Sequence, residues 1–174
     1  MRTLLIVVAA VAGVLMLLIF GVVAIGASLP KRHVATRNAS YRAKPEQLFA
    51  LIAGSQSWRS DVVKSETVTG ANGRELMRET GRGGTTITYE VSDCNPPTSL
   101  TRRIATENLP YSGSWTYSLE PSGSGTLVRI TEDGEVYNPV FRFVSRFVIG
   151  HTRTMDAYLR ALGKATGQEV EIKD

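Results

Sequence analysis

Two charged side chains, Arg102 and Glu132, fall on the predicted apolar faces of strands, where a charge could take part in chemistry. In the segment TLVRITEDGEV, Glu132 continues the face of Val128 and Ile130, because alternate side chains of a strand point to the same side. Arg102 lies in the same way within LTRRIAT. A buried Arg–Glu pair could orient a ligand or activate water as a general base. The alternative is a structural pair, or two side chains that a bulge or strand twist turns to solvent.

Aromatic side chains accompany these two charges in the predicted strands. Tyr89 in TTITYEV, and Trp115 and Tyr117 in SWTYSL, alternate with polar neighbours and so share one face of the sheet. Asp133 and Glu135 have the opposite parity to Glu132, and we expect them on the outer face of the strand or at its end. Of the three acids in this hairpin, Glu132 is therefore the candidate for chemistry.

Other reaction chemistries find little support in the sequence. The two histidines, His33 and His151, are far apart in the chain, and we expect them to be far apart in space. Cys94 is the single cysteine, so neither a disulfide nor a metal site with several converging ligands is expected. The glycines of GRGGTT and GSGT have the context of hairpin turns and not of a phosphate loop. We expect no cofactor and no metal. His151 could touch the mouth of a cavity or simply pack on a helix surface.

The chain from residue 31 onward has the pattern of a mostly antiparallel β domain. A first strand is predicted over 34–41, and a helix starts near Pro45. Trp58 then faces inward from a short helical turn. About six further segments between 61 and 136 are short, rich in β-branched or aromatic residues, and bounded by Gly, Pro or Asn. Their short connections predict an antiparallel meander.

A long amphipathic helix is predicted near the C-terminus. Asn138 is a candidate N-cap, Pro139 occupies the first helical position, and Gly150 could allow a bend. Apolar residues recur at spacings of three, four and seven: Val140, Phe143, Val144, Phe147, Val148, Met155, Tyr158, Leu159 and Leu162. This stripe needs an apolar surface, which one face of a curved sheet offers. The tail, 168–174, is polar and predicted to be frayed.

The N-terminal segment, residues 3–29, contains no charged residue. Because about 20 apolar residues span the hydrocarbon layer of a bilayer, its length suits a tilted transmembrane helix. A secretory signal peptide is the alternative, since Gly26, Ala27 and Ser28 would permit cleavage. The apolar region of a signal peptide is, however, usually about 7–15 residues long. We therefore expect an anchor over 1–30, a globular domain over 31–167 and a polar tail over 168–174.

Charges on either side of the apolar segment predict its orientation. Arg2 precedes it, whereas several basic residues follow: Lys31, Arg32, Arg37, Arg42 and Lys44. The positive-inside rule then favours a single-pass protein of the cell membrane with a cytoplasmic domain, and an extracytoplasmic domain is the alternative. The formal net charge of +4 is too small to indicate nucleic acid as a partner.

Four short sequence motifs follow one another along the chain: Leu29-Pro30 with His33-Val34, KPEQLFALIAGSQSW, WTYSLEPSGSGTLVRITEDGEV and NPVFRFVSRFVIGHTRTMDAYLRAL. In this order they resemble the START-related helix-grip superfamily (SRPBCC), and within it the polyketide cyclase/dehydrase and lipid-transport-like branch. The resemblance covers residues 33 to about 167. It implies an α+β helix-grip fold, in which a curved antiparallel sheet of about six or seven strands wraps around a long C-terminal helix. Here one transmembrane helix would precede that fold.

The resemblance also implies a cavity between the sheet and the last helix, able to hold a small lipophilic molecule. From the strand and helix patterns we predict its lining: Trp58, Tyr89, Arg102, Trp115, Tyr117, Glu132, Phe143, Phe147 and Met155. The leading hypothesis is a membrane-anchored binding domain for a lipophilic small molecule or lipid. One alternative is a cyclase/dehydrase-like enzyme that uses Arg102, Glu132 or a tyrosine. Another is an envelope-associated protein-interaction module. No catalytic set of the family can be carried over residue by residue.

Overall fold

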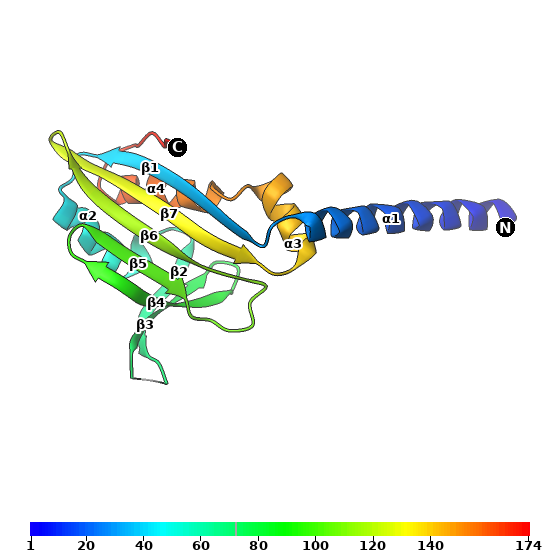
Figure 1. Cartoon of the computed structure of the whole chain (residues 1–174), viewed down its shortest axis with the longest axis horizontal. Coiled ribbons are helices and arrows are strands. Elements are labelled where there is room, and N and C mark those ends of the chain that lie inside the picture. The colour runs from blue at the N-terminus through cyan, green and yellow to red at the C-terminus, as the bar shows by residue number, and fades with distance from the viewer. Residues whose placement is uncertain (72) are drawn as a thin grey trace.

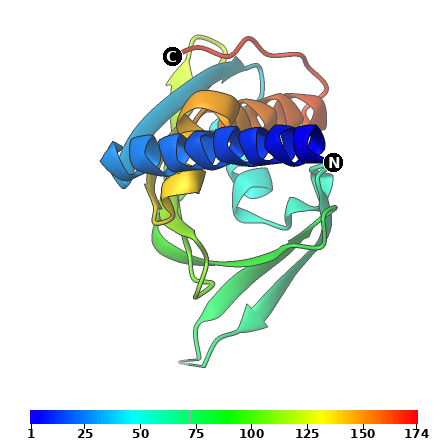
Figure 2. The same cartoon turned by 90° about the vertical axis from the view of Figure 1, so that its right-hand side faces the viewer.

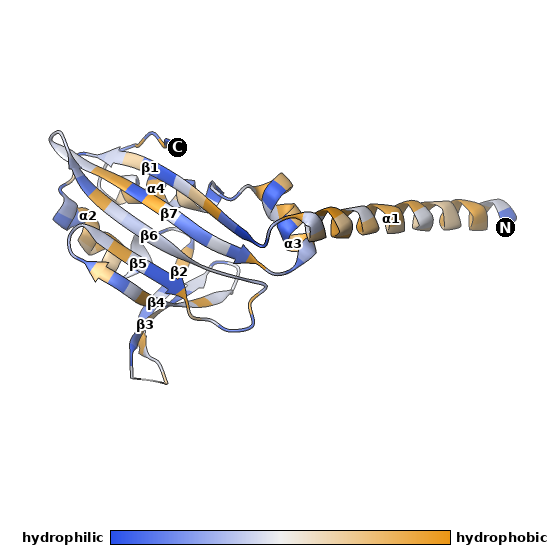
Figure 3. Cartoon of the chain, viewed as in Figure 1, coloured by the Kyte–Doolittle hydropathy of each residue, from blue (hydrophilic) through white to orange (hydrophobic). Residues whose placement is uncertain are grey.

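The structure is a computed structural model, and it describes residues 1–71 and 73–174 of the chain. A long N-terminal helix, α1 (Arg2–Ser28), projects from a domain built of a β-sheet and shorter helices (Figure 1). Its 27 residues correspond to a length of about 40 Å at a rise of 1.5 Å per residue. The helix is long and apolar enough to cross a membrane, and its residues are mainly hydrophobic from end to end (Figure 3). The predicted apolar helix is therefore present.

In the part of the chain that the structure describes, seven antiparallel strands form one sheet in the order β1-β7-β6-β5-β4-β3-β2. Strands β2 to β7 follow one another as a meander, which confirms the prediction, and β1 pairs with β7. The hairpin of β2 and β3 extends away from the rest of the domain (Figure 2). The strands are β1 (Arg32–Tyr41), β2 (Val62–Thr69), β3 (Glu75–Gly81), β4 (Thr86–Asn95), β5 (Ser99–Ile104), β6 (Tyr111–Ser122) and β7 (Gly125–Val136).

Short helical segments lie between β1 and β2 and after β7. Asn138 caps the first of the later segments, because its side-chain oxygen accepts hydrogen bonds from the backbone N–H groups of Val140 and Phe141. The predicted N-cap is therefore confirmed. The segments are α2 (Pro45–Ala53), the 3₁₀ turn η1 (Gln56–Trp58), α3 (Pro139–Val144), the π-helical segment η2 (Ser145–Ile149) and α4 (Arg153–Ala165).

The C-terminal amphipathic stretch is interrupted at Gly150, where a bend is predicted, but the interruption is a complete break, so the prediction of one long helix is wrong. α3 and η2 end at Gly150, whose φ of +80° lies in the region that glycine adopts without strain, and α4 begins at Arg153. The predicted apolar stripe is thereby divided between two segments. Phe147 and Val148 on η2 are exposed. The residues of the stripe on α4 are buried in the core: Met155, Tyr158, Leu159 and Leu162.

The core lies between one face of the sheet and the helices α2 and α4. Tyr41 at the end of β1 donates a hydrogen bond from its hydroxyl to the carbonyl oxygen of Leu159 on α4, at 2.8 Å. This contact joins the first strand to the last helix inside the core. The buried apolar residues are Ala39, Tyr41, Leu48, Phe49, Ile52, Leu100, Tyr117, Leu119, Val128, Ile130, Met155, Tyr158, Leu159 and Leu162.

The C-terminal tail lies against β1, so the prediction that it is frayed is wrong. The backbone N–H groups of Asn38 and Lys173 each donate to the carbonyl oxygen of the other residue at 2.9 Å. Val170 and Ile172 pack against the core. In an extended segment these two side chains point to the same side, and this alternation within a short polar sequence accounts for the docking of the tail.

Candidate functional site

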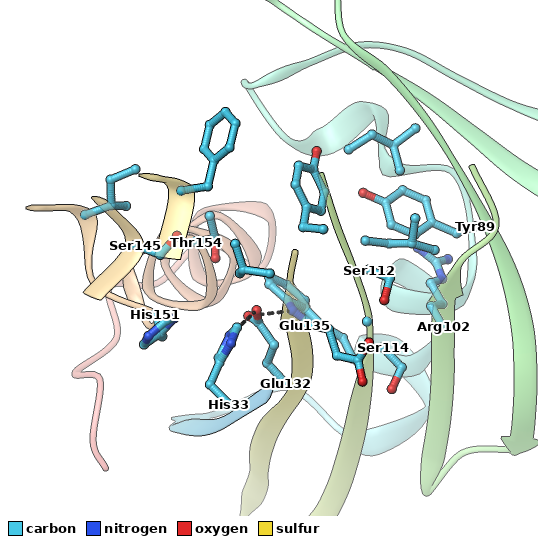
Figure 4. A pocket seen from close by; sticks show the side chains of 18 of the residues that line it. His33, Tyr89, Arg102, Ser112, Ser114, Glu132, Glu135, Ser145, His151 and Thr154 are labelled. Atoms are coloured by element: carbon cyan, nitrogen blue, oxygen red, sulfur yellow. Dashed lines mark hydrogen bonds and ion pairs between the residues drawn. The ribbon is translucent and has the colours of Figure 1, made fainter. Parts of the chain in front are cut away.

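A cavity of about 380 Å³ lies between the inner face of strands β3 to β7 and the junction of η2 with α4. Ligand pockets of proteins commonly measure roughly 300–1,000 Å³ and have mostly apolar walls. The aliphatic and aromatic residues that line this cavity are Ile87, Tyr89, Ile104, Tyr111, Trp115, Tyr117, Val136, Phe141 and Ile149. Polar side chains gather on two sides of it. Figure 4 shows His33, Glu132 and His151 on one side and Tyr89 and Arg102 on the other.

A carboxylate–histidine pair forms the first polar group. Glu132 and Trp115 are direct partners in the pairing of β6 with β7, and the indole Nε1–H of Trp115 donates to Glu132 Oε2 at 2.9 Å. The other carboxylate oxygen, Oε1, lies 3.1 Å from Nε2 of His33, on β1. His33 faces Gly134 in the pairing of β1 with β7. A Cβ atom at residue 134 would lie 2.5 Å from the His33 ring, so glycine there provides the space that the ring occupies.

The imidazole rings of His33 and His151 stack, with centroids 3.9 Å apart and planes inclined by 26°. The expectation that these residues lie far apart in space is therefore wrong. The break at Gly150 places His151 before α4, where it reaches β1. Burial lowers the pKa of His151, and the neighbouring charges of His33 and Arg146 act in the same direction, while Glu132 opposes them. His151 consequently favours its neutral form near neutral pH.

A second polar group surrounds Arg102, which is only 5% exposed. Its Nη2 donates to the carbonyl oxygen of Ile52 at 2.6 Å and to that of Ala53 at 3.1 Å, at the C-terminal end of α2. The last carbonyl groups of a helix carry partial negative charge and have no partner within the helix. Arg102 therefore satisfies the end of α2. Its Nε is also buried and has no hydrogen-bond partner among the described residues.

Glu79 on β3 is the buried counter-ion of this group. Its Oε1 lies 3.6 Å from Nη1 of Arg102, and its Oε2 accepts a hydrogen bond from Nη1 of Arg59 at 3.1 Å. Burial raises the pKa of Glu79, and the two guanidinium groups partly offset that effect. One carboxylate thus lies between two cations in the wall of the cavity. Arg59 also pairs with Asp61, at 2.6 Å, toward the solvent.

The predicted pair of Arg102 with Glu132 does not form, although both side chains line the cavity. Arg102 on β5 is the direct partner of Trp115 on β6, which in turn is the direct partner of Glu132 on β7. Two strand spacings of about 4.8 Å separate the two backbone positions. The Trp115 side chain belongs to the strand between them. Each charge instead finds a partner on its own side, Glu79 for Arg102 and His33 for Glu132.

Tyrosine hydroxyls add neutral donors to the site. Tyr89 and Tyr117 line the cavity, and burial raises the pKa of both phenols. They therefore keep their protons at physiological pH and can donate hydrogen bonds. Tyr158 on α4 supports this wall from behind, with its ring 5.4 Å from that of Tyr117 and 5.7 Å from that of Trp115. Its hydroxyl donates to Gln56 Oε1 at 3.1 Å.

The structure brings together part of the lining that the sequence predicts. Tyr89, Arg102, Trp115, Tyr117 and Glu132 all line the cavity. All five lie on strands, where side-chain parity alone indicates the inner face.

The other four predicted residues lie outside that lining. Trp58 packs edge-on against Tyr158, and Met155 is completely buried in the core. Phe143 and Phe147 pack against each other, with ring centroids 5.0 Å apart, on the segment that the break at Gly150 separates from α4. Periodicity placed these residues on a single helical stripe, and the break divides that stripe.

Sequence reasoning missed His33, Arg59 and Glu79 in the lining. Glu135, expected on the outer face or at the end of its strand, also lines the cavity, and His151 lies there as one of its two alternatives allowed. His33 lies outside the predicted first strand, and only the pairing of β1 with β7 brings it to Glu132. Glu79 belongs to the segment RELMRET, in which polar residues dominate, so parity gives no apolar face to assign. In the part of the chain that the structure describes, no group of three or more His, Cys, Asp or Glu residues is placed to hold a metal ion.

Comparison with protein families gives one match over most of the chain. The model of a family described as "Polyketide cyclase / dehydrase and lipid transport" matches residues 32–166. This range begins with β1 and ends just after α4, so it contains the sheet, the closing helices and the whole cavity. No curated protein matches the chain.

Solved structures share the fold at low sequence identity. A START superfamily protein from Mycobacterium smegmatis has a TM-score of 0.60 at 14% identity, over 78% of this chain and 97% of its own. Major latex-like protein 151 from Panax ginseng has a TM-score of 0.59 at 12% identity, over 79% and 96%. The protein XoxI from Bacillus cereus has a TM-score of 0.56 at 22% identity, over 78% and 95%. The domain therefore has the helix-grip fold, as the resemblance in sequence implies.

Proposed function

The chain belongs to the polyketide cyclase/dehydrase and lipid transport family, and on that premise we propose that it is a membrane-anchored binding domain for a lipophilic small molecule or lipid. Family and fold fit a ligand-binding domain. The main support for a lipophilic ligand is the cavity of about 380 Å³ with its apolar and aromatic walls. Its volume is near the lower end of the range for drug-sized ligands. A single chain or a small ring system fits this space.

The two polar groups of the cavity support a ligand with hydrogen-bonding ends. An apolar body would lie against Trp115 and Tyr117, and one end would face the His33–Glu132 pair. The other end would face Tyr89 and Arg102, whose buried Nε–H is an unused donor. Buried donors without partners cost free energy, so an oxygen atom of the ligand at that position would stabilise the complex. The ligand proposed is thus lipophilic in its middle and polar at its ends.

Helix α1 supports the membrane part of the proposal. It is long and apolar enough to span a bilayer, and an anchor would hold the cavity near a membrane reservoir of ligand at high effective concentration. The excess of Lys and Arg after α1 favours a cytoplasmic domain. Cys94, the single cysteine, is exposed at the end of β4 and offers a direct test. In intact cells a membrane-impermeant maleimide should leave it unlabelled, and Cys94→Ser provides the blank. Labelling before lysis would place the domain on the outer side.

The binding proposal is tested with the full chain extracted in a mild detergent. Native mass spectrometry should detect a co-purifying lipophilic molecule. Ile104 lines the cavity, so Ile104→Trp should fill part of it and weaken binding by about tenfold or more, since steric overpacking of a formed site typically costs about 1–3 kcal/mol. Val91→Trp, at an exposed position of β4, is the matched control. Absence of any bound ligand, together with no thermal shift from a library of lipophiles, would overturn the proposal.

A second function is an enzyme that uses acid–base chemistry, and the His33–Glu132 contact is the observation that favours it. A carboxylate that accepts the proton of one imidazole nitrogen orients the ring and raises the basicity of the other nitrogen. His33 could then take a proton from a substrate in the cavity. Glu132→Gln keeps the shape of the side chain and removes its charge. For an enzyme we expect a loss in kcat of about 100-fold with little change in KM. Turnover that survives this change would exclude this role of the pair.

A further inference from the structure

We propose that the outer surface of α3 and η2 contacts the lipid bilayer, so that the mouth of the cavity opens at the boundary between lipid and water. This α3–η2 surface consists of Val140, Phe141, Phe147, Val148 and Ile149. The inference rests on the anchor of the proposed function and adds to it a second membrane contact. It also assigns the route by which a ligand reaches the cavity.

Exposure of large apolar side chains marks this surface. Phe147 is 59% exposed and Val148 is 68% exposed, and the other three residues are also exposed. Val140 and Phe141 belong to α3, and Phe147 and Val148 belong to η2, so exposed apolar side chains occur in both parts of the segment. Single exposed apolar residues are common on soluble proteins, but a concentration of them in one segment indicates a binding surface.

The end of α1 holds α3 in place beside it. Gly26 is buried, and a Cβ atom there would lie 1.9 Å from the carbonyl oxygen of Pro139, so the two backbones are in direct contact. Arg142 of α3 is buried, and its Nη1 donates to the carbonyl oxygen of Leu29 at 2.7 Å and to that of Ala27 at 3.4 Å. These hydrogen bonds provide partners for carbonyl groups at the end of α1 that have none within the helix. The α3–η2 surface is therefore fixed next to the last turns of α1.

The length of α1 sets the depth of that contact. The helix is about 40 Å long, whereas the hydrocarbon layer is about 30 Å thick. Arg2 and the amino terminus place the first end among the headgroups on one side of the membrane. For an upright helix about 10 Å of the other end, which includes Gly26, then extends into the headgroup layer on the side of the domain, and a tilt of about 20° leaves roughly 8 Å. An amphipathic segment at this level buries its apolar face roughly 5–10 Å deep.

The charges near the surface fit a bilayer with anionic headgroups. Residues 136–155 contain no Asp or Glu, and Arg146 and Arg153 lie within them. Both are exposed, as is Lys31 between α1 and β1. Each basic residue near an anionic membrane contributes about 1 kcal/mol of attraction. A soluble protein partner could cover an apolar surface too, but the direct continuity with α1 favours lipid.

Two residues of the surface also belong to the cavity. Phe141 is 50% exposed and Ile149 is 49% exposed, and both line the cavity. They stand at its mouth, with one side toward the interior and one side toward the surroundings. A lipophilic molecule could therefore pass from the bilayer into the cavity along apolar side chains.

Spin labels in the full chain, reconstituted in nanodiscs of phosphatidylcholine and phosphatidylglycerol, test this inference. Cys94→Ser provides a background without cysteine. Val148→Cys reports on the surface, and Phe147→Cys repeats the measurement at its neighbour. Val63→Cys on β2 is the matched control, because Val63 is 69% exposed. Leu15→Cys reports on the middle of α1. We expect labels at 148, 147 and 15 to collide more often with dissolved oxygen than with a water-soluble nickel chelate, and the label at 63 to show the reverse.

The outcomes separate this inference from the anchor on which it rests. A label at residue 15 inside the bilayer, with labels at 147 and 148 as open to the nickel chelate as the label at 63, would overturn the surface contact and leave the anchor intact. A label at residue 15 that is open to the chelate would overturn both.

Discussion

Most charged side chains in the cavity wall, all except Glu135, occur in two groups, and specific partners hold each group. Glu79 lies between Arg59 and Arg102, and Glu132 lies between His33 and Trp115. Removing one partner of a buried ion pair leaves the other charge uncompensated in a medium of low dielectric constant. The arrangement therefore links the stability of the fold to the polarity of the cavity, because the same side chains serve both.

Substitution of Arg102 by Met tests that link. Arg102→Met removes the charge beside Glu79 and the hydrogen bonds to the end of α2. We expect the free energy of unfolding to fall by about 3 kcal/mol, measured by chemical denaturation of the full chain in nanodiscs.

The adjacent residue supplies the control for that experiment. Arg103→Met removes an exposed pair with Glu90 and should cost less than about 1 kcal/mol. Equal losses for the two variants would show that burial of Arg102 carries no special cost.

His151 should give the fold a dependence on pH. The groups that face it are His33 from β1, Glu132 from β7 and Arg146 from η2, and its pKa is lowered chiefly by burial. The unfolded chain therefore binds a proton more readily than the folded chain. Its contribution to stability is present above about pH 6.5 and is lost as the pH falls through the lower folded pKa.

Replacement of His151 by Phe, which can still stack on His33, should remove this contribution. We expect the thermal midpoint of the full chain to fall less between about pH 7.5 and 5.5 in His151→Phe than in the unchanged protein. If the thermal midpoint falls equally in the two proteins, the pH dependence of stability comes from groups other than His151.

At this scale the sequence predicts side-chain direction better than side-chain partners. Parity along the strands gives the inward direction of Arg102, Trp115 and Glu132. Parity does not give the hydrogen-bond or ion-pair partner of each side chain, because those partners depend on the order of the strands and on the positions of the helix ends. The stacked pair of His33 and His151 is the extreme case, since it requires both the pairing of β1 with β7 and the break at Gly150.

Helices and strands differ in how far local pattern determines them. The strands follow from alternation and from turn residues, and all of the predicted ones are present. The C-terminal helix does not follow from periodicity, because the apolar stripe continues across Gly150 while the backbone does not. The half before the break packs on α1, and only the half after it enters the core.

Close contact between α1 and α3 depends on a glycine. Gly26→Ala places a Cβ atom 1.9 Å from the Pro139 carbonyl oxygen, so one backbone must move. We expect the free energy of unfolding to fall by about 2 kcal/mol, a usual cost of overpacking, in a thermal or denaturant titration of the full chain in nanodiscs.

Gly21 of the same helix is the matched control, because nothing lies within 4 Å of a Cβ atom at that position. Gly21→Ala should leave stability unchanged or raise it slightly, since alanine favours helix more than glycine does. Similar losses in both variants would argue that the contact of α1 with α3 does not matter for stability.

At the scale of the whole molecule, the two ends of the globular domain meet at one strand, β1. β1 follows α1 directly, and the C-terminal tail pairs with β1 through Asn38 and Lys173. Val170 and Ile172 add apolar contact to the core at that place. The sequence does not reveal this closure, because the tail is short and polar and its partner strand is more than a hundred residues away.

Deletion of residues 169–174 tests the importance of the closure. The change removes the backbone bonds to Asn38 and the partial burial of Val170 and Ile172. We expect a loss of about 2 kcal/mol in the free energy of unfolding, on the scale of one fully buried aliphatic side chain. If the free energy of unfolding is unchanged after deletion, the docked tail contributes nothing to the stability of the domain.

The bonds from Arg142 to the end of α1 have a consequence for motion. Only residues 29–31 connect α1 to β1, and they span about 10 Å even when fully extended. Arg142 of α3 also binds this connection, through the carbonyl oxygen of Leu29. A domain on a long disordered linker could occupy many positions and reach an opposing membrane. With α1 as the proposed membrane anchor, this domain would instead diffuse with its anchor in the plane of the membrane, at a nearly fixed distance from the bilayer. Delivery to another compartment would therefore require a mobile acceptor that comes to it.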